Sequence, residues 1–166
     1  MIIRNMKQDE IEAVRELRLI GYSEYESCVS SEHWQVLKTS LLSDNDLKSN
    51  ASIFVAEMDG KIEGSIVLFP GSVRAYDWSE DVQEYPEIRM LSVNPTIRGK
   101  GIGRALVEHC LHVAKEQNNR KIGLHTASFM INASSLYESM GFYRVPELDL
   151  EPMKDGIIVK AYRLDL

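Results

Sequence analysis

The sequence contains little cysteine and little proline, and it has no long apolar run. Among its 166 residues there are two cysteines and five prolines. Two cysteines are too few for a disulfide framework, and we expect Cys28 and Cys110 to be buried thiols rather than ligands or nucleophiles. The first residues carry Arg4, Lys7 and Glu10 and no apolar stretch. We therefore expect neither a signal peptide nor a membrane span, and a cytoplasmic protein.

Positive charge is also scarce. The chain has 19 Lys and Arg residues against 25 Asp and Glu residues, a formal net charge of −6. Neutralising a nucleic-acid backbone requires a basic face, so this balance argues against a nucleic-acid partner and weakly favours a cationic small molecule or a basic peptide. The length, 44% hydrophobic content and 27% charged content predict one globular domain, residues 1–166, with a substantial core.

The most informative stretch is residues 88–104. Residues 88–93 are mostly apolar and end at Asn94-Pro95, which is typical of a strand, and apolar residues recur at helical spacing from Ile102 onward. Between them lies a basic, glycine-rich turn. A strand, a glycine turn and a helix in this order direct free backbone N–H groups and the positive end of the helix toward an anion. We expect a phosphate to be held by Arg98, Gly99, Lys100, Gly101, Ile102, Gly103 and Arg104.

The spacing of these glycines narrows the choice of phosphate ligand. It fits neither the G-x-x-x-x-G-K-[ST] loop of nucleotide triphosphatases nor the dinucleotide motif G-x-G-x-x-G. Instead, Arg98-x-x-Gly101-x-Gly103, five residues after Leu91-x-Val93, resembles the coenzyme A signature of the GNAT N-acetyltransferases. A second stretch, residues 133–142, reads Ala-Ser-Ser-Leu-Tyr-Glu-Ser-Met-Gly-Phe and is similar to the A-x-x-L-Y-E-x-x-G-F stretch found late in many members.

The order of predicted elements agrees with that resemblance. Strands are predicted at residues 1–6, 52–58, 61–69, 88–93, 121–126, 143–148 and 156–163, and helices at 7–20, from Ser30 or Ser31, from Ile102 and at 131–140. Asp59-Gly60 is a strong two-residue hairpin signal between the second and third strands. The pattern predicts an α/β fold with a mixed, partly antiparallel sheet flanked by helices in a single domain, which is the element order of the GNAT fold.

The resemblance implies transfer of an acetyl group from acetyl-CoA to a primary amine by direct attack, with no metal. The central strand would splay from its neighbour and offer the backbone of Leu91, Ser92 and Val93 to the pantetheine arm. Tyr137 matches the general acid of the family, and the Leu91 N–H would stabilise the oxyanion. Ordinary half-buried packing is the alternative for Tyr137. A homodimer is compatible with the family.

The general base has two candidates. Glu87 stands just before the central strand, where glutamates act as base in histone-type members, and we rank it slightly first. His125 occupies a position where some peptide N-terminal acetyltransferases carry a glutamate, and its ordinary pKa suits neutral pH. A solvated carboxylate, a structural histidine and a water relay remain open. In one departure, Met130 replaces an Asn that often contacts the coenzyme, and we expect Asn132 to lie nearly on the opposite side of the helix.

An acidic stretch with interleaved aromatic residues precedes the central strand. It contains Asp77, Glu80, Asp81, Glu84 and Glu87 together with Tyr76, Trp78 and Tyr85. Carboxylates and aromatic faces attract an ammonium group, so we expect an acceptor such as a polyamine, an aminoglycoside-like amine or a basic peptide, although a solvated loop is an equal alternative. Rival functions are an enzyme using a longer acyl-CoA, a non-catalytic acyl-CoA-binding sensor or toxin-neutralising partner, and a structural domain.

Overall fold

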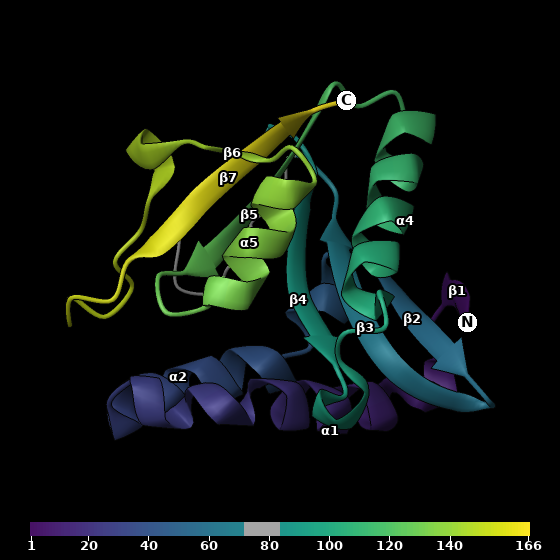
Figure 1. Ribbon diagram of the computed structural model, residues 1–166, viewed down its shortest axis with the longest axis horizontal. Coiled ribbons are helices and arrows are strands. Elements are labelled where there is room, and N and C mark those ends of the chain that lie inside the picture. Colours follow the sequence, from purple (N-terminus) through teal and green to yellow (C-terminus); the bar gives the residue numbers. More distant parts are fainter. Residues whose placement is uncertain (72–83) are drawn as a thin grey trace.

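The computed structural model describes residues 1–71 and 84–166, and within them the chain forms one sheet of seven strands in the order β1-β2-β3-β4-β5-β7-β6 (Figure 1). Only β4 and β5 pair in parallel among these described neighbours. This is the mixed, mostly antiparallel sheet that the sequence predicts. The strands are β1 (Ile2–Asn5), β2 (Ser52–Met58), β3 (Lys61–Phe69), β4 (Glu87–Val93), β5 (Lys121–Ala127), β6 (Tyr143–Arg144) and β7 (Val159–Asp165).

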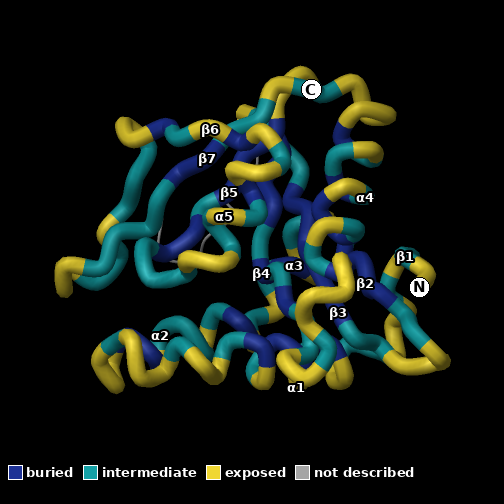
Figure 2. Tube along the Cα trace, in the orientation of Figure 1, coloured by how far each residue is buried: buried dark blue, intermediate teal, exposed yellow. Residues whose placement is uncertain are grey.

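Helices cover both faces of this sheet. They are α1 (Ile11–Tyr22), α2 (Ser31–Leu42), the short α3 (Asn45–Lys48), α4 (Ile102–Glu116) and α5 (Ile131–Ser139). Because neighbouring side chains of a strand point to opposite faces, β2 contributes to two cores. Val55 packs with Val14 of α1, whereas Phe54 packs with Leu106 of α4. Figure 2 shows the resulting band of buried residues along the central strands.

Local sequence signals account for several element boundaries. The β2–β3 hairpin turns at Asp59 and Gly60, both with positive φ (50° and 76°), as a type I′ turn requires. The Ser30 side chain accepts a hydrogen bond from the His33 N–H and caps α2. The predicted strand at residues 143–148 is shorter than expected, because β6 ends at Arg144 and a 3₁₀ helix, Pro146–Leu148, follows. Pro146 has no N–H to continue the strand ladder.

The two cysteines have different environments. Cys110 is fully buried on the inner face of α4, as expected, and burial raises the pKa of its thiol. Cys28 is exposed, so its expected burial was wrong. It ends the 3₁₀ helix Ser23–Cys28, a polar segment in which no residue is buried. Among the described residues, no helix combines the length and the apolar composition that crossing a membrane requires.

The central strand β4 is bent and leaves its neighbour early. Met90 has a positive φ of 55°, and the β3–β4 register shifts between Ser65 and Val67. Such a bulge bends a strand and changes the direction of its side chains. In the described register, β4 and β5 pair only at Glu87–Gly123 and Ile88–Leu124. Figure 1 shows the two strands diverging beyond this point, with α5 beside the gap.

Candidate active site

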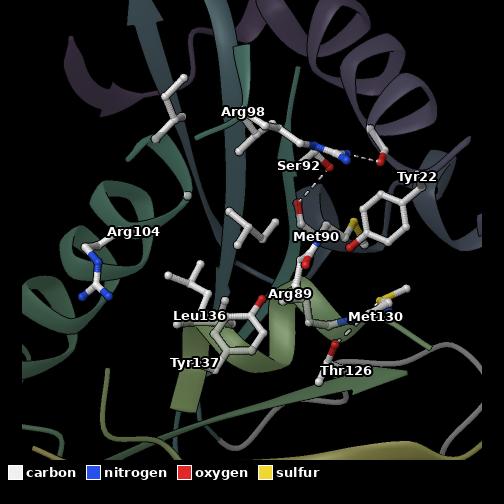
Figure 3. A pocket seen from close by; sticks show the side chains of 18 of the residues that line it. Tyr22, Arg89, Met90, Ser92, Arg98, Arg104, Thr126, Met130, Leu136 and Tyr137 are labelled. Atoms are coloured by element: carbon white, nitrogen blue, oxygen red, sulfur yellow. Dashed lines mark hydrogen bonds between the residues drawn. The ribbon is translucent and has the colours of Figure 1, made fainter. Parts of the chain in front are cut away.

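A cavity of about 450 Å³ lies where β4 leaves β5 (Figure 3). Its walls come from the end of α1, from β4, from the glycine turn and the start of α4, and from β5 and α5. Two predicted residues are not among the described lining residues: Lys100 is exposed, and Glu87 is buried beneath the wall. The predicted residues that do line the cavity are Leu91, Ser92, Val93, Arg98, Gly99, Gly101, Ile102, Gly103, Arg104, His125 and Tyr137.

The glycine turn has the backbone that an approaching anion needs. Gly99 and Gly101 have φ values of 83° and 79°, in the left-handed region that favours glycine. A Cβ atom at either position would meet no described atom within 4 Å, so the space in front of the turn is open. Gly101 is also the N-cap residue of α4, whose first N–H groups have no partner within the helix. The turn therefore fits a phosphate group through its main chain.

The basic side chains near this turn already make contacts. Arg98 donates to the Glu24 carboxylate at 2.6 Å and to the Gly21 carbonyl at 2.9 Å, which joins the glycine turn to the end of α1. Arg104, in the first turn of α4, donates to the Ser139 hydroxyl of α5 at 2.7 Å. Both arginines therefore brace the cavity wall and place positive charge around it. In Figure 3, Arg98 and Arg104 lie at different parts of that wall.

Tyr137 lies on the side of α5 that faces the sheet. Its residue exposure is 6%, and its ring packs edge to face against Phe142 with ring centres 5.8 Å apart. Figure 3 shows Tyr137 beside Leu136, both projecting from α5. Burial raises the pKa of the Tyr137 hydroxyl, so the group keeps its proton throughout the neutral range. A buried, protonated hydroxyl at a cavity wall can serve as an acid.

Glu87 and His125, the two candidate bases, are bonded to each other. Glu87 Oε1 lies 2.7 Å from His125 Nδ1, and the side chains are 2% and 4% exposed. His125 Nε2 lies 3.1 Å from the Leu148 carbonyl oxygen. Because a carbonyl only accepts, Nε2 carries a proton in this arrangement. Burial acts to lower the pKa of His125, but the hydrogen bond and charge of Glu87 outweigh it, and the pKa is raised.

The sequence and the fold identify the family of the chain. A model of the acetyltransferase (GNAT) family matches residues 12–142. The chain belongs to the GNAT family. It is 33% identical to N-acetyltransferase family 8 member 2 of Rattus norvegicus over 104 residues, which cover 59% of this chain and 41% of that protein. It is 26% identical to an uncharacterized N-acetyltransferase of Methanocaldococcus jannaschii over 145 residues, which cover 84% of this chain and 59% of that protein.

Another relative is the N-acetylaspartate synthetase of Danio rerio, 32% identical over 104 residues that cover 62% of this chain and 34% of that protein. The chain thus spans from about a third to about three fifths of the length of these relatives. Solved structures share the whole fold. A GNAT acetyltransferase of Staphylococcus aureus Mu50 has a TM-score of 0.72 at 20% identity, covering 99% of this chain and 98% of that one. The PaiA N-acetyltransferase of Thermoplasma acidophilum, solved with coenzyme A, has a TM-score of 0.71 at 16% identity. The match covers 99% of this chain and 98% of that one.

Several residues in the wall of this GNAT cavity are absent from the sequence-based site. Tyr22 and Tyr25, at and after the end of α1, both line it, with ring centres 5.9 Å apart. Tyr25 also packs against Phe129, 5.4 Å away. Arg89 lines the cavity from β4. The aromatic residues of the polar segment after α1 were a weak signal for this wall, because nothing in the sequence relates that segment to β5.

The reason for expecting Asn132 on the opposite side from Met130 does not hold. Both Met130 and Asn132 line the cavity. The prediction treated the two residues as parts of one helix, in which a separation of two residues points side chains nearly opposite ways. Met130 instead has φ −83° and ψ 66°, and α5 begins at Ile131. The helical rotation therefore does not relate Met130 to Asn132.

The acidic stretch before β4 lies mostly outside the described residues. This applies to Tyr76, Asp77, Trp78, Glu80 and Asp81. Glu84 is exposed. Tyr85 is partly buried, with the Arg163 guanidinium over its ring at 5.1 Å. Tyr85 therefore contacts β7 through Arg163. The role of the acidic stretch in binding the acceptor stays a prediction.

Proposed function

We propose that this GNAT protein is an N-acetyltransferase that transfers the acetyl group of acetyl-CoA to a primary amine by direct attack. One observation carries the proposal: a single cavity extends from the left-handed glycine turn to Tyr137 and His125 along the part of β4 beyond its described pairing with β5. When bound, the coenzyme supplies an acetyl group activated as a thioester. The N–H groups from Gly99 to Arg104 would hold its pyrophosphate, and the backbone of Leu91, Ser92 and Val93 would hold the pantetheine arm.

The side chains around the cavity suit the proton transfers of this reaction. In direct attack a C–N bond forms, the C–S bond breaks, the amine loses a proton and the sulfur gains one. The protonated hydroxyl of Tyr137 would donate to the sulfur as the C–S bond breaks, because this residue lies at the cavity wall. The Glu87–His125 pair would take up the amine proton through a water molecule, because Glu87 does not itself line the cavity. His125 Nε2 already donates to Leu148, so we assign the accepting capacity of the pair to Glu87.

We propose a general class of acceptor and a narrower one. The general class, a primary amine, follows from the reaction class. The finer proposal, a cationic small amine or a basic peptide, rests on the sequence of the acidic stretch and on the excess of acidic residues. One of the relatives is an N-acetylaspartate synthetase, and aspartate is an amino acid. Free amines, amino acids and basic peptides therefore all belong in an acceptor screen.

The first experiment is thermal unfolding with acetyl-CoA, coenzyme A, a longer acyl-CoA or ATP at equal concentrations. A ligand that binds only the folded protein stabilises it by about 2.7 kcal/mol at a hundred times its Kd. We expect acetyl-CoA and coenzyme A to raise the unfolding midpoint and ATP to leave it unchanged. Thiol release with a panel of amines then measures turnover. Stabilisation without turnover on any amine would favour a non-catalytic acyl-CoA sensor, and no stabilisation at all would overturn the proposal.

A further inference from the structure

A second, smaller cavity adjoins the first. Its volume is about 120 Å³, and it lies between α2, the β4–β5 region and the segment before β7. The two cavities share five lining residues, which we call the common wall: Tyr22, Arg89, Met90, His125 and Met130. Figure 3 shows Tyr22 and Met130 on the side of the larger cavity away from Arg104. A group that occupies the second cavity is therefore adjacent to the His125 side of the proposed reaction site.

The second cavity lies apart from the residues proposed to hold the coenzyme. Its described lining contains no residue of the glycine turn, and neither Leu91 nor Tyr137. A ligand in it would therefore approach the reaction site from the side opposite to the coenzyme. His125, which belongs to the proposed proton acceptor, stands in the common wall. The molecule that loses a proton is the amine, so this cavity suits part of the acceptor.

The described walls of this cavity are mostly aliphatic or aromatic. Val36, Leu37 and Leu41 come from α2, and Phe129 and Val159 come from the segments that follow β5 and begin β7. Burying an apolar group against such walls is favourable in proportion to the area removed from water. A cavity of about 150 Å³ with similar walls in another protein binds benzene, so this one fits an apolar group of about four or five carbons.

A second ammonium group would be poorly placed here. The described lining contains no aspartate or glutamate. Its two histidines are already bonded to carboxylates, because His33 Nδ1 lies 2.6 Å from Asp155 Oδ2 and His125 Nδ1 lies 2.7 Å from Glu87 Oε1. An ammonium ion that left water for this cavity would lose its hydration without a carboxylate in the described wall to replace it.

We propose that the acceptor is a small primary amine with one apolar group of about four or five carbons, which occupies the second cavity while the nitrogen lies at the common wall. This inference rests on the proposed acetyltransferase function and names the substrate class of the same site. It replaces the polycationic acceptor, suggested by composition, with an amine whose single charge is at the reacting nitrogen.

Apolar surroundings also help the reaction itself. Direct attack requires a neutral amine, because an ammonium nitrogen has no lone pair to donate. Burial disfavours the charged form of a group and so lowers the pKa of an amine. An amine whose substituent fills the second cavity is held beside apolar walls, and loss of its proton toward the Glu87–His125 pair is favoured there.

The test begins with amines that differ only in their substituent, with thiol release from acetyl-CoA as the readout. Isopentylamine should have a kcat/KM about 10- to 50-fold higher than ethylamine, since three more carbons are buried. Octylamine should be poorer than isopentylamine, because its chain exceeds the cavity. Putrescine has a second ammonium group where isopentylamine has its methyl groups, and it should be poorer by at least the same factor as ethylamine.

Two further pairs of acceptors identify the source of the apolar group. Leucine is compared with glycine, and the peptide Leu-Gly-Gly with Gly-Gly-Gly, so that each pair differs by one isobutyl group. In whichever pair turnover is measured, the member with the isobutyl group should be preferred. The pair with the higher turnover shows whether a free amino acid or a peptide N-terminus is the better source.

Variants in α2 connect this preference with the second cavity. Leu37→Ala enlarges the cavity and should move the optimum toward longer amines, whereas Val36→Phe narrows it and should move the optimum toward shorter ones. Leu42→Ala is the matched control, because Leu42 lies on the same helix, is 40% exposed and is outside the described lining of both cavities. It should keep the wild-type order of amines. Opposite shifts in two variants cannot come from partial unfolding, which would lower activity on all amines.

Occupancy can also be measured without turnover. Isopentyl alcohol has the same apolar group as isopentylamine but no amine to be acetylated. Saturation-transfer NMR with the protein and coenzyme A should detect its binding, with a smaller signal in Val36→Phe and an unchanged signal in Leu42→Ala. Equal signals in all three proteins would place the alcohol elsewhere and overturn the inference.

The outcomes separate this inference from the proposed function. If putrescine, spermidine or a basic peptide is acetylated faster than isopentylamine, the inference is overturned and the acetyltransferase proposal stands. The same holds if Leu37→Ala changes the preference between acetyl-CoA and isovaleryl-CoA but not the order of amines, since the cavity then holds the acyl chain. If acetyl-CoA binds but no amine is acetylated, the proposed function falls and the inference falls with it.

Discussion

Glu87 at the start of β4 and His125 on β5 form one buried pair, with a carboxylate oxygen 2.7 Å from the imidazole. The residues are 38 positions apart in sequence, and the parallel pairing of Glu87 with Gly123 brings them together. Their side chains are 2% and 4% exposed. Removing one partner of such a pair leaves a charge or a polar group buried alone, which costs about 3–5 kcal/mol. The pair is therefore part of the fold as well as a candidate proton acceptor.

His125 should make stability depend on pH. Its pKa is raised above 6.5 in the folded protein. The stability that comes from this shift is present below the unfolded value of about 6.5 and is lost as the pH rises through the higher folded value. We expect the difference in unfolding free energy between the wild type and His125→Gln to be larger near pH ~6 than at alkaline pH. Urea unfolding of both proteins across this range measures it, and a difference that grows with pH would contradict the assignment.

Tyr137→Phe should separate binding from chemistry. Removing the proposed acid should lower kcat by about 10²-fold or more and leave the Kd of acetyl-CoA within about twofold. Tyr143→Phe is the matched control, because Tyr143 is exposed and its hydroxyl bonds to Asp165 at 3.2 Å. Steady-state kinetics and calorimetric titration give the two quantities. Full activity in Tyr137→Phe would assign this side chain to packing alone.

Gly101→Ala should weaken coenzyme binding beyond its effect on stability. Gly101 and Gly60 have similar φ values, 79° and 76°, and a Cβ atom at either meets no described atom within 4 Å. Alanine should therefore cost about 1–2 kcal/mol of backbone strain at both positions. Gly60 lies in the β2–β3 turn and does not line the cavity, so Gly60→Ala is the control. We expect only Gly101→Ala to raise the Kd of coenzyme A, by about tenfold or more. If both variants bind coenzyme A with equal affinity, the glycine turn is not part of the binding site.

Gly64→Ala tests how β3 positions the helix that begins at the phosphate turn. A Cβ atom at Gly64 would lie 2.7 Å from Ile102 Cγ2 and 3.0 Å from Leu106 Cδ1. Overpacking of this kind costs about 1–3 kcal/mol, and here relief requires α4 to move away from the sheet. We expect lower stability in urea unfolding together with a higher Kd for coenzyme A. Lower stability with unchanged affinity would show that the first turn of α4 is positioned independently of this contact.

Local sequence patterns predicted the elements well where a single segment carries the signal. The Asp59-Gly60 turn, the cap at Ser30 and the apolar spacing of α4 depend on residues within a few positions of one another. Predictions failed for two different reasons. The effects of Pro146 on β6 and of the non-helical Met130 before α5 are local, and the sequence-based predictions did not use them. The exposure of Cys28 depends on tertiary packing, since no residue of its 3₁₀ segment is buried.

The sequence by itself determined the family motifs, the positive-φ glycines of the phosphate turn and the residue types for acid and base chemistry, because these are properties of single residues and short spacings. Only the tertiary structure decided that Glu87 and His125 are one pair rather than two alternatives. The tertiary structure also decided that Arg89 lines the cavity. The pair depends on the parallel pairing of β4 with β5, and Arg89 follows the last residue of β4 in that described pairing. Pairing register is set by packing across the sheet, and no short stretch of sequence encodes it.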